Sequence, residues 1–450
     1  MNISDPGTAR TSALPQGSQV DPDQLRRATL ASSVGSALEY YDFYIFGLAT
    51  ALVFAPLFFA PFGDAKVIVG FATFGIAYVA RPIGGLLFGF IGDRWGRKVV
   101  LLSTIALMGS ASFLIGLLPT YTQIGAAAPI MLVALRILQG LGAGAEQAGA
   151  TTLISEVSPA PRRGFFAALP FVGIQLGTLL GAGTFTLLGL VDPKIVQVWL
   201  WRVPFLASFI LIVTALVIRL RLKETPVFRE LEAHEEVVKN PVKSVWASSK
   251  GAVLKGIGVR MAENGNSSIF SAIAVSFLGT VAVFKDDKAL GPVALLIAAA
   301  FSAVAVVFFG WLSDRVGRVP VYRYGALFQA IIALPAFYLL TLGQAWLVIV
   351  VITVGIALGV QSMLGPQCAL LPEMFGATHR FTGVALSREI SAMLASGLVP
   401  VLIAAALEAT HNSWLVLGLF SLVLSLITFG TTFALRETRG RDLTVLADGA

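Results

Sequence analysis

Long apolar segments alternate with short polar ones along this chain. Twelve of the apolar segments reach about twenty residues or more, which is the length that an α-helix needs to cross a bilayer. They lie near 28–56, 67–91, 99–119, 129–155, 165–190, 200–220, 252–284, 290–312, 321–342, 346–371, 382–407 and 413–435. The pattern therefore predicts an all-α membrane protein with twelve transmembrane helices.

Two polar tails flank the predicted helices, and one polar linker divides them into two groups of six. Residues 1–24 and 437–450 are predicted to be tails, the first of them disordered. Residues 222–250 contain the charged run "KETPVFRELEAHEEVVKNPVK" and are predicted to be a linker. We therefore expect one six-helix bundle over residues 25–221 and a second over residues 251–436.

Basic residues lie almost entirely on one side of the predicted helices. The loops on the other side hold only the four lysines Lys66, Lys194, Lys285 and Lys288. Because Lys and Arg are retained on the cytoplasmic side of multi-spanning proteins, both termini are predicted to lie in the cytoplasm. The same rule explains the net charge of +7, so nucleic acid is not expected as a partner.

The composition supports a membrane protein and excludes several other classes. Apolar residues make up 56% of the chain and charged residues 13%, which is about half the charged share of a soluble protein. The single cysteine, Cys368, excludes a disulfide framework. The three histidines are scattered, and the sequence shows no metal-binding spacing and no nucleophile–base pair. We therefore expect no metal, no cofactor and no enzyme activity.

Three motifs of the first half return in order in the second half. "GDRWGRK" (92–98) returns as "SDRVGRV", "LISEVSPAPRRG" (153–164) as "LLPEMFGATHRF", and "ALEYYD" (37–42) as "MAENGN". Three landmarks at nearly one offset predict two halves related by duplication, an architecture of transporters. The offsets are 221 residues from Asp93 to Asp314, 217 from Glu156 to Glu373 and 224 from Glu39 to Glu263.

Each charged hairpin joins two predicted helices on the cytoplasmic side. An aspartate there can lie against the positive N-terminal end of a neighbouring helix. We also predict ion pairs of Arg97 with Glu156 and of Arg318 with Glu373, which would hold the cytoplasmic side closed. The alternative is that these charges only set the orientation, for which lysines alone would serve. The predicted cytoplasmic gate comprises Asp93, Arg94, Arg97, Glu156, Asp314, Arg315, Arg318 and Glu373.

The first hairpin and its surroundings, "GFIGDRWGRKVVL" (89–101), resemble the signature loop of the major facilitator superfamily. Further stretches resemble the metabolite:proton symporter family, which includes bacterial carriers for shikimate, α-ketoglutarate, citrate and proline/betaine. The resemblance implies the major facilitator fold of two six-helix bundles. The fifth span lacks the Gly-Pro motif of the antiporters, which favours symport. The matching stretches are "GSALEYYDFYIFG" (35–47), "YVARPIGGLLFG" (78–89), "LRILQGLGAGAEQAGA" (135–150), "SPAPRRGF" (158–165), "WRVPF" (201–205) and "KETPVF" (223–228).

Two carboxylates, Glu39 and Asp42, lie inside the first predicted helix, where an ionisable side chain is costly unless it is paired or hydrated. Their spacing places both on one helical face, and two neighbouring carboxylates need not both be ionised. We predict that they take part in proton coupling; the alternative is that they pair with arginines and only hold helices together. The resemblance implies a coupling role for Arg136 of the fourth helix, and we add Glu146 to this set.

The seventh predicted helix carries polar residues at helical spacing, so this face should line a cavity. Because Glu39 occupies the equivalent position in the first half, the cavity should lie between the first and seventh helices. An arginine beside an amide can bind a carboxylate. The predicted substrate-binding residues are Arg260, Glu263, Asn264, Tyr41, Gln147 and Arg81.

Two arginines of the interior have more than one interpretation. Arg81 either contacts the substrate or forms a structural pair with Glu146 or Asp42. Arg388 and Glu389, early in the eleventh helix, either select the substrate or bond locally.

Together these features predict a proton-coupled symporter of the bacterial inner membrane that takes up a small organic carboxylate by alternating access. Tyrosines near the acids leave a zwitterion of the proline/betaine type as an alternative. A sugar facilitator or drug exporter and a non-transporting substrate sensor are further alternatives. The expected partners are the organic acid or zwitterion, protons and the lipid bilayer, and we expect a monomer.

Overall fold

The regular structure of the chain is helical throughout the part that the computed structural model describes. The all-α prediction is confirmed, since no strand occurs in this described part. The predicted N-terminal tail and central linker lie almost wholly outside it. The described residues are 22–188, 191–220, 248–278 and 290–445, with the single residues 245, 281, 284 and 448.

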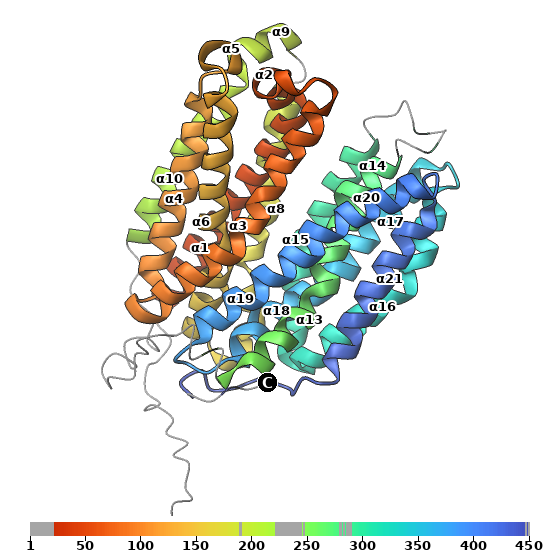
Figure 1. The fold of residues 1–450 in the computed structure, drawn as a ribbon. Coiled ribbons are helices and arrows are strands. Elements are labelled where there is room, and N and C mark those ends of the chain that lie inside the picture. Colours follow the sequence, from red (N-terminus) through yellow and green to blue (C-terminus); the bar gives the residue numbers. More distant parts are fainter. Residues whose placement is uncertain are drawn as a thin grey trace, which may run out of the picture.

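The first half of the chain forms one group of long helices (Figure 1). Its elements are α1 (Pro22–Ala49), η1 (Thr50–Phe54), α2 (Ala55–Phe58), η2 (Ala60–Ala65), α3 (Lys66–Trp95), α4 (Arg97–Leu117), α5 (Tyr121–Ile124), α6 (Ala127–Val157), η3 (Ala160–Arg162), α7 (Arg163–Ala168), α8 (Pro170–Leu188), α9 (Pro193–Ile195), η4 (Val196–Leu200) and α10 (Arg202–Leu220).

The second half forms a matching group. Its elements are α13 (Lys250–Ser268), η5 (Ile269–Ile273), α14 (Ala274–Leu278), α15 (Leu290–Val316), α16 (Arg318–Leu340), α17 (Ala345–Thr353), η6 (Val354–Val360), α18 (Gln361–Met374), α19 (Arg380–Ala392), η7 (Met393–Leu398), α20 (Val399–Ala409) and α21 (Trp414–Thr432). The segments η5, η6 and η7 are π-helical turns that continue the line of α13, α17 and α19.

Ten helices of the described part are long and apolar enough to cross a membrane. The first helix of each half, α1 and α13, is not among these ten. Both carry charged side chains that are buried in the interior, Glu39 and Asp42 on α1 and Arg260 and Glu263 on α13. Both of these helices therefore turn charged faces toward the interior of the molecule.

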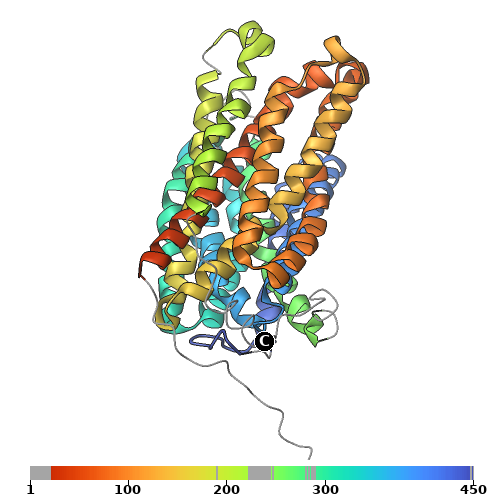
Figure 2. The same cartoon turned by 90° about the vertical axis from the view of Figure 1, so that its left-hand side faces the viewer.

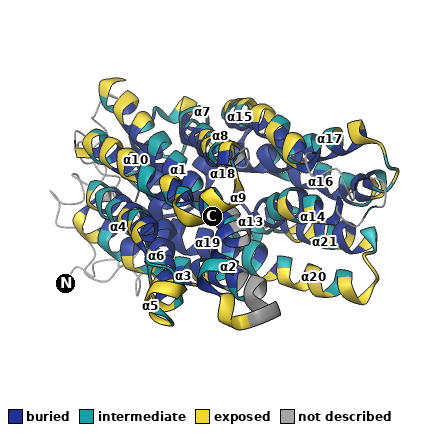
Figure 3. Cartoon of the chain, turned by 90° about the horizontal axis from the view of Figure 1, so that it is seen from above, coloured by how far each residue is buried: buried dark blue, intermediate teal, exposed yellow. Residues whose placement is uncertain are grey.

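The two halves meet through a limited set of helices. Helix α3 packs against α19, α7 against α15 and α18, and α8 against α15. Away from this contact the two groups diverge toward the end of the molecule opposite the C-terminus (Figure 1). The long axes of the helices are roughly aligned with one another (Figure 2). Buried residues line the helices that face one another, and exposed residues cover the outer faces (Figure 3).

The two charged hairpins are turns of one glycine each. Gly96 joins α3 to α4 and Gly317 joins α15 to α16, with φ angles of 101° and 116° that only glycine adopts without strain. Because the turns are so short, α3 and α15 run past their predicted ends into the hairpins. Asp93 and Asp314 thus lie on the last helical turns rather than in loops. We call the end of the molecule that holds both turns and the C-terminus the hairpin end.

A close crossing brings the halves together near the hairpin end. Helices α7 and α15 meet at Gly164 and Gly310. A Cβ atom at Gly164 would lie 2.5 Å from the backbone oxygen of Gly310, and one at Gly310 would lie 2.6 Å from the oxygen of Gly164. Glycine at both positions therefore lets the two halves approach backbone to backbone.

Candidate functional site

A cavity with a volume of about 140 Å³ lies between the two halves, and we call it the central cavity. As predicted, the first and seventh helices both line it. The second half lines it with Arg260, Glu263, Asn264 and Ser267 of α13 and with Ser271 of η5. From the first half it is lined by Tyr40, Phe43 and Tyr44 of α1, Tyr78 and Arg81 of α3, Gln147 of α6, and Phe171 and Ile174 of α8.

Arg260 is held by a dense set of hydrogen bonds at the wall of the central cavity. Its Nη1 donates to Gln367 at 2.7 Å, its Nε to Ser391 at 3.0 Å and its Nη2 to Asn264 at 3.0 Å. The carboxylate of Glu263 lies 3.3 Å from Nη2. Each donor nitrogen of this guanidinium therefore already has an acceptor inside the second half.

Arg81 and Glu39 form an ion pair across α3 and α1. Arg81 Nη2 lies 2.9 Å from Glu39 Oε1, and Gln147 Nε2 donates to the same oxygen at 3.4 Å. The guanidinium also lies over the ring of Tyr78, 5.3 Å from its centre. The structural partner of Arg81 is thus Glu39 rather than Glu146 or Asp42, because helix α1 turns Glu39 toward α3.

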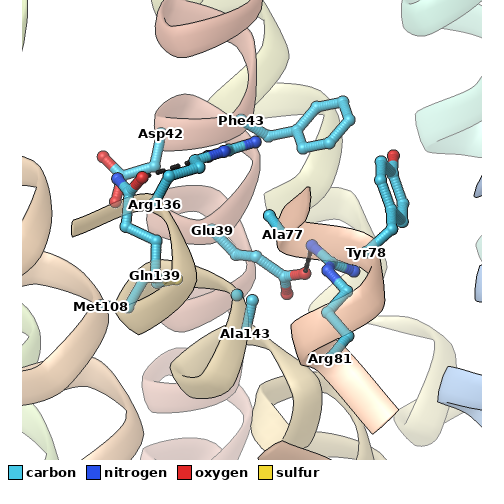
Figure 4. Close-up of a pocket in the computed structure, with 11 residues that line it drawn as sticks. Glu39, Asp42, Phe43, Ala77, Tyr78, Arg81, Met108, Arg136, Gln139 and Ala143 are labelled. Carbon is cyan, nitrogen blue, oxygen red and sulfur yellow. Dashed lines mark hydrogen bonds and ion pairs between the residues drawn. The ribbon is translucent and has the colours of Figure 1, made fainter. Parts of the chain in front are cut away.

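A second, smaller space adjoins the first and holds the other acid of α1. This acid pocket has a volume of about 20 Å³, enough for one water molecule, and is lined by Asp42, Glu39, Arg136 and Gln139, among others (Figure 4). Arg81, Phe43 and Tyr78 line both spaces. The Glu39–Arg81 pair therefore stands at the boundary between the acid pocket and the central cavity.

Asp42 belongs to a chain of hydrogen bonds at the inner wall of the acid pocket. Ser112 of α4 donates to Asp42 Oδ2, Gln139 Nε2 donates to Ser112 Oγ at 2.6 Å, and Arg136 Nη1 donates to Gln139 Oε1 at 3.1 Å. Arg136 lies 4.0 Å from the centre of the Phe46 ring. The predicted coupling residues Glu39, Asp42 and Arg136 are thus brought together, and Ser112 and Gln139 join them.

Glu146 and Tyr41 lie apart from both spaces. The Glu146 carboxylate is bound by Arg219 of α10 and accepts from Thr104 at 2.9 Å, and all three side chains are buried. The Tyr41 hydroxyl donates to the backbone oxygen of Pro204 at 2.8 Å, within the apolar core of the first half. Tyr40 and Tyr44, its neighbours on the helix, face the central cavity instead.

The surroundings of Glu146 favour a structural role. In Glu146→Gln the buried Arg219 would lose its counter-charge, which costs about 3 kcal/mol or more for a buried pair. We expect a lower melting temperature in detergent and no change, per folded molecule, in the substrate-driven proton flux that the sequence predicts. Glu408→Gln, which changes an exposed acid near the end of α20, is the matched control. Lost flux at an unchanged melting temperature would instead return Glu146 to the coupling residues.

At the hairpin end, each hairpin aspartate binds the start of a helix from the other half. Asp93 accepts from the backbone N–H groups of Phe381 and Thr382 at 3.1 and 2.8 Å, at the N-terminus of α19. Asp314 accepts from those of Gly164 and Phe165, both at 2.8 Å, at the N-terminus of α7. The predicted contact of the aspartates with helix N-termini is confirmed, and it crosses between the halves.

Glu373 is the centre of an ion-pair cluster at this end. It lies 3.3 Å from Arg318, which confirms the predicted pair, and 2.8 Å from Arg163 of the first half. Arg318 is also 2.7 Å from Asp314. Thr438 of the C-terminal segment donates to Glu373 at 2.8 Å. This cluster therefore joins both halves and the C-terminal segment.

The equivalent acid of the first half, Glu156, pairs with Arg380 of the second half at 2.9 Å. Arg163 and Arg380 are absent from the predicted gate, although they lie 217 residues apart at equivalent positions of the repeated motifs. The repeated motifs could therefore have identified both arginines as gate residues. The side chain of Arg97 lies outside the described residues, so its pair with Glu156 stays a prediction.

Two predicted gate residues, Arg94 and Arg315, do not reach into this cluster. Both are exposed. Arg94 lies 5.6 Å from the ring centre of Trp95, and Arg315 lies 4.1 Å from that of Trp311. Stacking on aromatic rings at the surface holds these guanidinium groups away from the acids.

Comparison with known proteins places this architecture in a family. The family model described as sugar (and other) transporter matches residues 28–250 and 228–447. The chain is 32% identical to the shikimate transporter of Escherichia coli K12, over 95% of this chain and 98% of that protein. It is 31% identical to the proline/betaine transporter of Salmonella typhimurium LT2, over 94% and 86%.

Two further similarities bear on location and fold. The chain is 34% identical to the inner membrane metabolite transport protein YhjE of E. coli K12, over 93% of this chain and 95% of that protein. The structure of the proton:xylose symporter XylE bound to 6-bromo-6-deoxy-D-glucose matches with a TM-score of 0.71 at 19% identity, over 94% and 98% of the two chains. The chain is a multi-pass protein of the inner membrane.

These matches extend over almost the whole chain and confirm the resemblance seen in the hairpin and helix motifs. The chain belongs to the sugar (and other) transporter family of the major facilitator superfamily, and it is a transporter rather than an enzyme.

Proposed function

We propose that the protein is a proton-coupled symporter that takes up a small organic acid by alternating access. One observation carries this proposal. The Glu39–Arg81 pair stands between a water-sized pocket that holds Asp42 and a larger cavity lined by arginines. A proton and an anion can thus reach the two partners of one ion pair from opposite sides.

This arrangement supports a direct form of coupling. A proton that enters the acid pocket can neutralise Glu39 or Asp42, the two carboxylates that line it. When Glu39 is neutral, it no longer balances the charge of Arg81. Arg81 is then available to the carboxylate of a substrate in the central cavity, since a buried guanidinium needs a counter-charge. Without the proton, the substrate has to compete with Glu39. Proton and substrate binding would in this way favour each other.

The volume and lining of the central cavity favour a small metabolite. A cavity of about 150 Å³ accommodates a molecule the size of benzene, and the central cavity is close to that at about 140 Å³. Arg81, Arg260 and Arg388 line it, which favours an anion. A zwitterion of the proline/betaine type is the second candidate, because Tyr40 and Tyr44 offer aromatic faces to a cation.

We further propose that α1 and α13 complete a set of twelve membrane-spanning helices, in bundles over residues 25–221 and 251–436, and that the hairpin end faces the cytoplasm with both termini. The Glu373–Arg163 and Glu156–Arg380 pairs then act as a gate that is closed in this structure. Opening to the cytoplasm would break these pairs, and the substrate and proton would leave together. The protein would work as a monomer.

Purified protein in liposomes with a trapped pH-sensitive dye tests this function. Shikimate, α-ketoglutarate, citrate, proline, betaine and xylose are added outside, one at a time. We expect acidification of the lumen with one of the organic acids or zwitterions and none in empty liposomes. Acidification with xylose alone would favour a sugar carrier. Binding of a compound without any proton movement or uptake would favour a sensor.

A further inference from the structure

The ion pairs of the central cavity leave one arginine and one acid to account for. Arg81 is paired with Glu39 at 2.9 Å, and Arg260 with Glu263 at 3.3 Å. The remaining charged residues of the cavity wall are Arg388 and Glu389, which follow each other on α19.

Arg388 is buried, at 2% exposure, but its hydrogen-bonding capacity is largely unused. Nη2 contacts Gln147 Oε1, whereas Nε and Nη1 have no hydrogen-bond partner among the described residues. The guanidinium carbon lies 5.7 Å from the ring centre of Phe171, which supports one face of the group. Buried donors without acceptors are costly, so a guanidinium held in this way at a cavity wall is prepared for an acceptor that the protein does not supply.

Glu389 lacks a hydrogen-bond donor, just as Arg388 lacks acceptors. It is buried at 4% exposure, and its Oε2 has no hydrogen-bond partner in the described part of the chain. Its side chain packs on α3, since a Cβ atom at Gly85 would lie 3.3 Å from Glu389 Cγ. The carboxylate is therefore positioned at the cavity wall with an acceptor oxygen that lacks a donor.

Arg388 and Glu389 have no equivalent in the first half, unlike the gate residues, which occur in both halves. At the offset of 217 residues that relates Glu156 to Glu373, the first half has Phe171 and Val172 in place of Arg388 and Glu389. The gate acids, the hairpin aspartates and Arg163 with Arg380 all recur in both halves. A charged pair that occurs in only one half is not required by the shared gate, and it lines the space that a substrate would occupy.

We infer that Arg388 binds the carboxylate of the transported molecule and that Glu389 accepts a hydrogen bond from a second group of the same molecule. The substrate is then an organic acid that also bears a hydroxyl or an ammonium group, rather than an unsubstituted carboxylic acid or a sugar. This assignment rests on the proposed function and makes Arg388 and Glu389 its specificity-determining residues.

Matched pairs of probes test the assignment in the liposome assay. Shikimate is compared with cyclohex-1-enecarboxylate, which keeps the ring and the carboxylate but lacks the hydroxyl groups. Proline is compared with N,N-dimethylproline, which lacks the N–H donors. In the wild type we expect the donor-bearing member of one pair to have at least about tenfold lower KM, as one buried hydrogen bond allows. The pair that responds distinguishes a hydroxy acid from an amino acid.

Two variants then assign the contacts. Arg388→Gln is expected to raise the KM of both members of that pair by about 100-fold, because a charge-assisted bond is lost. Arg388→Lys should recover part of this loss, since it keeps the charge without the planar fork. Glu389→Leu should raise the KM of the donor-bearing probe only, so that the two members become alike. Arg27→Gln and Glu408→Gln, at exposed positions, are the controls.

The outcomes separate the two proposals. A wild-type protein that moves no protons with any probe contradicts the proposed function and this assignment with it. A wild type that responds, together with an unchanged KM in Arg388→Gln, contradicts the assignment alone. Equal effects of Glu389→Leu on both members of a pair would remove Glu389 from substrate recognition.

Discussion

In Asp42→Asn, accumulation of substrate against its gradient is expected to disappear. A pH gradient of one unit is worth about 1.4 kcal/mol per proton, enough for about tenfold accumulation by a one-proton symporter. The variant should reach only equal concentrations inside and outside. Asp42 is buried in the acid pocket and accepts from Ser112, and its Oδ1 has no hydrogen-bond partner in the described part of the chain. An amide preserves the shape of the site but cannot carry the proton.

Exchange of labelled for unlabelled substrate across liposomes with equal concentrations on both sides provides the control for this variant. It requires substrate binding and the conformational cycle but no net proton movement, so Asp42→Asn should retain it. Ser112→Ala, which removes the donor to Asp42 but not the carboxylate, should keep at least part of the accumulation. Full concentrative uptake by Asp42→Asn would remove this residue from the coupling mechanism.

Glu373→Gln is expected to shift the protein toward a state that is open at the hairpin end. Glu373 is fully buried and pairs with Arg163 of the first half and Arg318 of the second. Removing one partner of a buried ion pair costs about 3 kcal/mol or more in the closed state. In an open state, water can solvate the two arginines, so the loss there is smaller. A difference of this size would change the ratio of the two states by about 100-fold.

Distances between spin labels measure this shift. The single native cysteine, Cys368, is buried and is first replaced by alanine. Cysteines are then placed at Val99 and Val316, which are exposed beside the two hairpin turns in opposite halves. Glu373→Gln should increase the population with a long distance between the labels. Glu408→Gln should leave the distribution unchanged, and an unchanged distribution in Glu373→Gln would show that this acid does not hold the end closed.

Ten helices of the described part could be predicted from apolar length, because a helix that crosses a bilayer needs about twenty apolar residues. The pattern could not show that each hairpin turn consists of a single residue. Helices α3 and α15 continue to Trp95 and Val316, since one glycine with a positive φ completes each turn. Asp93 and Asp314 thereby reach the helix N-termini of the opposite half.

The pairing of the interior charges was harder to predict than their presence. Helical spacing shows which residues share a face, but the rotation of one helix against its neighbours decides which acid an arginine meets. Arg81 forms an ion pair with Glu39, whereas Glu146 forms one with Arg219. Arg219 lies at the end of an apolar segment, where a basic residue also fits the orientation rule, so the sequence pattern did not mark it as an interior partner.

Helix rotation and the packing of the two halves also decide which tyrosines reach the cavity and which gate residues pair. Tyr40 and Tyr44 share the face that lines the central cavity, whereas Tyr41 is turned by about 100° along the helix into the core. Arg163 and Arg380 were predictable in principle, because the repeat aligns them, but only the fold shows that each reaches an acid of the opposite half.

Simultaneous measurement of substrate entry and lumenal acidification in the same liposomes tests the central claim most directly. A labelled substrate identified by the probe panel is added outside wild-type proteoliposomes, and both signals are recorded from the first seconds. Coupled symport predicts that protons enter with the substrate at a constant ratio, whatever the substrate concentration. Substrate that enters through the protein while the lumenal pH stays constant would contradict it.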